Sequence, residues 1–108
     1  MLDFATYLTQ LASLIYQDNA KKGFWNGERN FAEAMMLVVT ELSEAVEAAR
    51  HNNPPSEHVD AGEVEEEIAD AIIRLLDWCG GRGIDIGKVV MEKLEYNRTR
   101  PYLHGKTF

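Results

Sequence analysis

The sequence predicts an all-α fold in which four helices form a bundle. Apolar residues recur at steps of three and four along four separate stretches of the chain. Capping residues, glycines and prolines separate these stretches, and none shows the two-residue alternation of a β-strand. Because 108 residues are enough for one hydrophobic core, we expect a single domain over residues 1–108.

The N-terminal half predicts two helices joined by a loop. The first helix follows Asp3, a good N-cap, and is expected to end near Gln17. Residues 18–30 contain two glycines and three asparagines and are predicted to form a loop that carries Phe24 and Trp25. The second helix should begin near Phe31 and end at the segment Asn52-Asn53-Pro54-Pro55. Its apolar stripe consists of Phe31, Met35, Val38, Leu42, Ala45 and Ala49.

The C-terminal half predicts two more helices and an irregular tail. The third helix should begin near Asp60 or Ala61 and end at Gly80-Gly81. The fourth should be capped by Asp85 and end after Asn97. The residues expected to face the core are Ala61, Val64, Ile68, Ile72, Leu75 and Cys79 of the third helix, and Ile86, Val89, Val90 and Leu94 of the fourth.

Charge is distributed unevenly along the chain. The net charge of −7 argues against binding of a nucleic-acid polymer, which needs clustered Lys and Arg. Ten of the 18 acidic residues fall within residues 41–70, where Arg50 is the only Lys or Arg. Residues 93–108 carry Lys93, Arg98, Arg100 and Lys106 but only one acidic residue. One region is therefore suited to cations and the other to anions.

The sequence favours a cytoplasmic protein without a membrane segment. The first residues carry neither a basic flank nor a long apolar run, and no stretch is long enough to cross a bilayer. Cys79 is the only cysteine, so an intrachain disulfide is excluded and a reducing compartment fits. We expect Cys79 to be a buried helix residue.

Two pairs of acidic residues predict a divalent-cation site. Helical geometry places Glu41 and Glu44 on one flank of the second helix, and Glu67 and Asp70 on one flank of the third. Since consecutive helices joined by a turn run antiparallel, the four carboxylates can face one space. Such a set of oxygen ligands favours Mg²⁺, with Mn²⁺ as a substitute, over zinc.

Two other interpretations of these acids are considered. Acidic helix faces are commonly just solvated, although two pairs beside the core stripes weaken this interpretation. A ferritin-like di-iron site would need the spacing Glu-x-x-His, which the sequence does not contain. The three histidines, His51, His58 and His104, lie at expected helix ends, loops or the tail, where a surface role is expected.

The acidic pairs resemble those of the MazG-like all-α nucleoside triphosphate pyrophosphohydrolase superfamily. Its pattern is Glu-x-x-Glu followed by Glu-x-x-Asp on the next helix, which Glu41, Glu44, Glu67 and Asp70 match. The similarity extends roughly from Phe24 to the end of the chain. Further matching segments are Arg29-Asn30, Gly83-Ile84-Asp85, Lys93 with Asn97, and Arg98-Thr99-Arg100-Pro101.

The resemblance implies Mg²⁺-dependent hydrolysis of a nucleoside triphosphate, ribose or deoxyribose, to monophosphate and pyrophosphate, in a role that clears unwanted nucleotides. The four acids would be the metal-binding and catalytic residues. The sequence has no Gly-rich Walker loop, so the triphosphate would be held by metal ions and basic side chains. Lys93, which also has a catalytic role in this interpretation, and Asn97 project on the same side as Ile86 and Val90.

Three further residues complete the predicted substrate site. Arg98 and Arg100 are expected to be surface or subunit-interface residues, although a tail that carries them could also close over the phosphates. Trp25, on the loop before the second helix, is the first candidate for stacking on the base, with Phe24 and Trp78 behind it. For Phe24 we expect a core-filling role instead.

Alternative functions and the state of assembly stay open at this point. A phosphoribosyl-ATP pyrophosphohydrolase would keep the same fold and change the substrate. A noncatalytic helical interaction module would use the acids only for solubility. Because one short bundle whose helices are apolar on more than one side needs a partner surface, we expect a homodimer or a homotetramer.

Overall fold

The computed structural model describes residues 3–107, and this part of the chain is helical without any β-strand. Its elements are α1 (Phe4–Lys21), α2 (Phe31–Arg50), α3 (Glu63–Gly81), α4 (Ile86–Arg98) and the short 3₁₀ helix η1 (Tyr102–Gly105). The predicted all-α class and its four helices are confirmed. None of the described helices is long and apolar enough to cross a membrane.

Two helix boundaries differ from the sequence prediction. Helix α1 continues past Gln17 to Lys21, because no helix-breaking residue occurs before Gly23, whose φ is 94°. Helix α3 begins at Glu63 rather than near Asp60. The preceding residues form a closed loop instead, in which the backbone N–H of Ser56 donates to the carbonyl of Ala61 at 2.9 Å.

The cap predicted for α4 is present, and α2 also begins after a capping residue. Asn30 precedes α2 and its side chain accepts from the N–H of Glu33 at 3.0 Å. Asp85 precedes α4 and accepts at 3.5 Å from the N–H of Lys88 and at 2.8 Å from the hydroxyl of Thr9. The Thr9 hydroxyl in turn accepts from the N–H of Gly87 at 2.9 Å, so the cap of α4 is also its attachment to α1.

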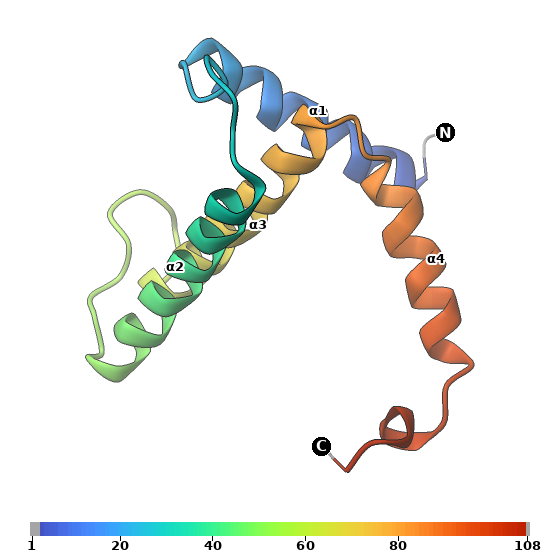
Figure 1. Cartoon of the computed structure of the whole chain (residues 1–108). Helices are drawn as coiled ribbons and strands as arrows, with labels where there is room; N and C mark the ends of the chain where they lie inside the picture. The colour runs from blue at the N-terminus through green and yellow to red at the C-terminus, as the bar shows by residue number, and fades with distance from the viewer. Residues whose placement is uncertain (1–2, 108) are drawn as a thin grey trace.

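The helices are arranged as an antiparallel pair with two further helices at one end (Figure 1). Helices α2 and α3 lie side by side, and α1 packs across the C-terminal end of α3. Helix α4 starts beside the N-terminal part of α1 and runs away from the α2–α3 pair (Figure 1). The four helices therefore do not surround a common core within one chain, which corrects the expectation of a closed bundle.

Two glycines set these crossings. A Cβ atom at Gly80 of α3 would lie 2.2 Å from the carbonyl oxygen of Ala12 in α1. A Cβ atom at Gly87 of α4 would lie 1.7 Å from the carbonyl oxygen of Ala5. Both helices approach the α1 backbone so closely that any larger side chain has to displace them.

The core is small and leaves most large apolar side chains exposed. Its buried apolar members are Ala12, Ala34, Val38, Ala45, Ala48, Ala71, Leu76 and Trp78. Of the inward positions expected on α4, Ile86 is half-buried. The others are wrong for a single chain: Val89 is 54% exposed, Leu94 46% and Val90 36%, because α4 departs from the other helices. Leu42 of α2 and Ile72 of α3, which were also expected to face the core, are 48% and 51% exposed.

The dimensions of the chain agree with this open arrangement. Its radius of gyration is 16.3 Å, whereas a compact chain of this length has about 13 Å. Its accessible surface is 8326 Å², whereas about 6,100 Å² is expected for a compact monomer of this mass. The chain thus presents far more surface than a closed domain of the same size.

We expect Gly80→Ala to destabilise the protein although alanine favours helix, because its methyl group would displace α1. Overpacking of this kind costs about 1–3 kcal/mol, which corresponds to a loss of several degrees in Tm. Gly27→Ala is the matched control, since nothing lies within 4 Å of a Cβ atom there. Thermal melts should show a lower Tm for Gly80→Ala alone, and equal melting of both variants would contradict the close crossing.

Candidate metal centre

Three of the four predicted carboxylates converge between α2 and α3. Glu41, Glu67 and Asp70 each offer an oxygen, and these oxygens all lie within 4.8 Å of one another. Glu41 is 8% exposed and comes from α2, whereas the other two are half-buried and come from α3. Glu44 lies one turn further along α2 and is exposed, so it stands at the rim of this acidic cluster.

Glu67 carries the least satisfied oxygen of the acidic cluster. Its Oε2 is buried, and no hydrogen-bond donor in the described part of the chain reaches it. Hydrogen bonding to the Glu41 carboxylate, together with burial and the nearby Glu44, raises the pKa of Glu67 to about 8. This oxygen needs either a proton or a cation. A buried oxygen without a donor, in an all-oxygen set, fits Mg²⁺ or Mn²⁺.

Glu41 and Asp70 respond to this environment in opposite ways. Burial alone would raise the pKa of Glu41, but its hydrogen bonds with Glu67 and Arg74 lower it below the ordinary value. Burial, with the charge of Glu41, raises the pKa of Asp70. The Nε of Arg74 donates to Oε1 of Glu41 at 2.9 Å, so one guanidinium already lies against the cluster.

A buried aspartate that the sequence interpretation overlooked fixes the loop before α2. Asp77 is 4% exposed, and its Oδ1 accepts from Nε1 of Trp25 at 2.9 Å. Its Oδ2 accepts from Nη1 of Arg29 at 2.7 Å. The position of Asp77, seven residues after Asp70, could have revealed it, because residues seven apart share one helix face. Cys79, expected to be a buried helix residue, lies on α3 and is half-buried.

A cavity of about 270 Å³ adjoins the acidic cluster. Its polar and aromatic lining includes Asn19, Phe24, Arg29, Glu41, Asp70 and Arg74. Two guanidinium groups therefore share one cavity with two carboxylates of the cluster. An anion that also carries a cation would meet complementary charges there.

Trp25 lies apart from this cavity. Its ring packs edge-on against Tyr16 at 5.2 Å between centroids and also contacts Trp78 at 5.9 Å. It lines a separate hollow of about 530 Å³ with Arg29 and Arg82. The aromatic side chain that lines the cavity beside the acidic cluster is Phe24, which is 63% exposed.

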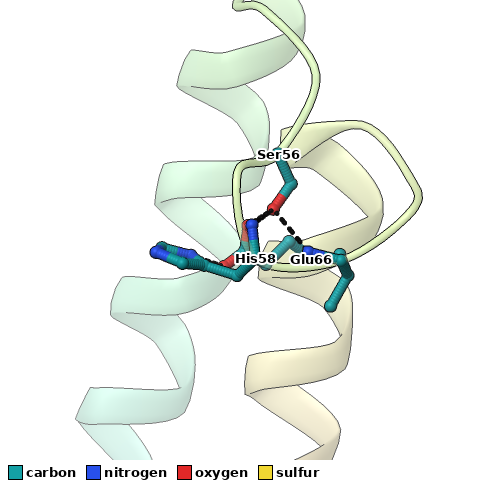
Figure 2. Close-up of polar contacts among 4 residues, drawn as sticks. Ser56, His58 and Glu66 are labelled. Atoms are coloured by element: carbon teal, nitrogen blue, oxygen red, sulfur yellow. Dashed lines mark hydrogen bonds and ion pairs between the residues drawn. The ribbon is translucent and has the colours of Figure 1, made fainter.

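The loop that joins α2 to α3 is held by Glu66, the neighbour of Glu67. Figure 2 shows Ser56 and His58 of this loop beside Glu66 of α3. The Ser56 hydroxyl donates to Oε1 of Glu66, and Nδ1 of His58 lies 2.9 Å from Oε2. These contacts lower the pKa of Glu66 and raise that of His58. Glu66 thus serves the loop and not the acidic cluster.

The predicted basic residues are not brought to the acidic cluster of the same chain. Lys93 is exposed on α4, with its Nζ 4.5 Å from the centre of the Tyr96 ring, so the expected inward projection is wrong. Arg98 pairs with Glu95 at 3.1 Å, and Arg100 lies 5.7 Å from the Tyr96 ring centre. The reason is the direction of α4, which leads away from α2 and α3 (Figure 1).

Asn97 is the exception on α4. Its Oδ1 is buried and no donor of the described residues reaches it. Like Glu67, this residue has an unmet hydrogen-bonding requirement in the single chain.

Comparisons of this chain with protein-family models, curated proteins and solved structures found no match. The resemblance to the MazG-like superfamily therefore stays a prediction, carried by the residues that suggested it.

We expect Glu67→Gln to stabilise the protein in a chelating buffer, more at pH 8 than at pH 5. The folded-state pKa is about 8, above the ordinary 4.5, so between these values the folded chain holds a proton that the unfolded chain has lost. Parental stability therefore falls as pH rises through this window, whereas glutamine does not titrate. Thermal melts at several pH values measure the difference, and Glu65→Gln on the same helix is the control. Parallel pH profiles for Glu67→Gln and the parent would contradict the shift.

Proposed function

We propose that this chain is a Mg²⁺-dependent pyrophosphohydrolase of nucleoside triphosphates that releases the monophosphate and pyrophosphate. The observation that carries the proposal is the convergence of Glu41, Glu67 and Asp70 around a buried Glu67 oxygen without a donor. The cavity beside them, with Arg29 and Arg74, supports an anionic substrate. The resemblance to MazG-like enzymes supports attack at the α phosphorus and a role in clearing unwanted nucleotides.

In this proposal Glu41, Glu67 and Asp70 hold Mg²⁺ or Mn²⁺, and Glu44 can join them from the rim. A cation bound there would neutralise phosphate oxygens and make a water molecule more acidic. Glu44 is the carboxylate of the set that stays exposed, so it is best placed to accept a proton from water. Binding of the cation requires Glu67 to give up the proton that its raised pKa retains near neutrality.

The nucleotide would lie with its phosphates beside the acidic cluster. Arg29 is fixed by Asp77, and Arg74 lies against Glu41. Because both residues line the same cavity, both guanidinium groups are available to the phosphates. Phe24 offers an exposed aromatic face at this cavity for a base. Trp25, the residue first predicted to stack on the base, holds the loop that carries Phe24 and lines the neighbouring hollow.

The proposal also includes assembly with a second copy, as a homodimer or within a homotetramer. The surface excess over a compact monomer, roughly 2,000 Å² per chain, is of the size that stable interfaces bury. The arm formed by α4 and η1 is basic and the α2–α3 pair is acidic, so the surfaces of two copies are complementary. In such an assembly, Lys93, Asn97, Arg98 and Arg100 of one copy would reach the acidic cluster of the other copy. They do not reach the acidic cluster of their own chain.

We expect Glu41→Gln and Glu67→Gln each to abolish turnover, because the amide keeps the volume but removes the charge that the cation requires. Phosphorus NMR on a panel of nucleoside triphosphates and phosphoribosyl-ATP should show monophosphate, or phosphoribosyl-AMP, and pyrophosphate from the parent protein. Glu65→Gln should keep its activity. Activity in both site variants would exclude this metal centre, and orthophosphate as the first product would exclude the reaction.

We expect Lys93→Ala to lower kcat/KM about ten- to a hundredfold, the loss of one charge-assisted contact. If Lys93 acts on the neighbouring copy, mixing inactive Glu67→Gln with Lys93→Ala should restore activity. A randomly mixed dimer has intact acids and an intact arm in about one site of four, so about a quarter of parental activity should return. Lys88→Ala on the same helix is the control. No recovery in subunits shown by light scattering to have exchanged would exclude a shared site.

A further inference from the structure

Within residues 3–107, Arg74 is the one basic side chain that contacts the acidic cluster directly. It lies one turn after Asp70 on α3, and its Nε donates to Oε1 of Glu41 at 2.9 Å. Its side chain is 39% exposed, whereas that of Glu41 is 10% exposed, so the guanidinium reaches inward from the cavity to a buried carboxylate. Its two terminal nitrogens form no hydrogen bond within the described residues.

The contact places Arg74 in competition with any cation that Glu41 binds. Glu41 is already engaged on one side by Glu67 and on the other by Arg74. A divalent cation drawn to the same carboxylates meets a fixed positive charge at its ligand, and the two repel. Arg74 therefore neutralises the acidic cluster when no divalent cation is bound, and opposes the binding of one.

Arg29 in the same cavity is held differently. Its partner Asp77 is buried and is also fixed by Trp25, and the Arg29 guanidinium lies 4.5 Å from the centre of the Trp25 ring. The Arg29 side chain is 19% exposed, half the value for Arg74. Arg29 is thus anchored by a partner outside the acidic cluster, whereas Arg74 is bound only to a group that a cation would take over.

We propose that Arg74 is a phosphate-binding residue that exchanges partners, leaving Glu41 when a divalent cation binds and turning to a phosphate group in the adjoining cavity. This inference rests on the proposed function, because it needs both a cation and a phosphate-bearing substrate. The same side chain would then balance the charge of the acidic cluster before binding and the charge of the substrate after it. No covalent step is involved.

Arg74→Met separates the two roles, because it keeps an unbranched side chain of similar length and removes the charge. Without nucleotide, its affinity for Mn²⁺, followed by the electron paramagnetic resonance of free Mn²⁺, should rise about three- to tenfold, as expected when one positive charge is removed from a hydrated site. Its affinity for inorganic triphosphate, with Mg²⁺ in excess, should fall about tenfold or more. A purely structural role would weaken both affinities together.

Arg74→Lys and Arg50→Met complete the experiment. Arg74→Lys keeps the charge, so its Mn²⁺ affinity should stay near the parental value. It also serves as the second test variant if thermal melts show that Arg74→Met folds poorly. Arg50→Met removes one charge at the last turn of α2 and should change neither affinity by more than about twofold. Unchanged or weaker Mn²⁺ binding by Arg74→Met, with triphosphate affinity unchanged, would overturn the inference while parental Mn²⁺ binding still supported the metal centre. A parent protein without saturable Mn²⁺ binding would overturn the metal centre and the inference with it.

Discussion

The antiparallel contact between α2 and α3 forces carboxylates of both helices into one small space, and much of the structure compensates for this. Two carboxylate charges less than 5 Å apart repel by roughly 3 kcal/mol at an effective dielectric of 20. The chain meets this cost in two ways. Glu67 retains a proton to a pH of about 8, and Arg74 places a positive charge against Glu41. The acidic cluster is thus tolerated through groups that a divalent cation can replace.

The acidic cluster also lies between two attachments of neighbouring segments to α3. At the C-terminal end of α3, Asp77 binds Trp25 and Arg29 and so fixes the loop that enters α2. At the N-terminal end, Glu66 binds Ser56 and His58 and fixes the loop that leaves α2 (Figure 2). Because both ends of α2 are tied to α3, repulsion between the carboxylates cannot simply spread the helices apart. Rigid support of this kind is what a site for a small, strictly coordinated cation requires.

Local features of the sequence were predictable, and the relative directions of the helices were not. Helix periodicity and caps such as Asp3 and Asp85 act over a few residues, so they predicted the helices and the convergence of acidic residues from α2 and α3. The course of α4 depends instead on the contact of Gly87 with the α1 backbone, which no period in the sequence encodes. For this reason Lys93 and Leu94 are exposed in a single chain instead of facing its core.

The contacts of Trp25 were equally hidden from a pattern analysis. An aromatic residue on a loop is suited to stacking on a base, and only the position of Asp77 reveals that the indole N–H is already bound. Arg74 and Asp77 share a helix face with Asp70, so the spacing was visible, but their roles depend on partners far away in the sequence. Sequence spacing shows which residues share a helix face, but it does not show which residues of other elements they contact.

The small size of the core links the acidic cluster to the proposed assembly. Most of the buried apolar residues of α2 and α3 are alanines, which allow two backbones to approach closely but bury little apolar surface. Larger apolar side chains are left exposed on all four helices. In the proposed assembly, the hydrophobic stabilisation that the single chain lacks would come from a second copy, whose exposed apolar faces have the same deficit. The acidic cluster and the proposed assembly would then have one origin, the close contact between α2 and α3, whose buried apolar residues are mostly alanines.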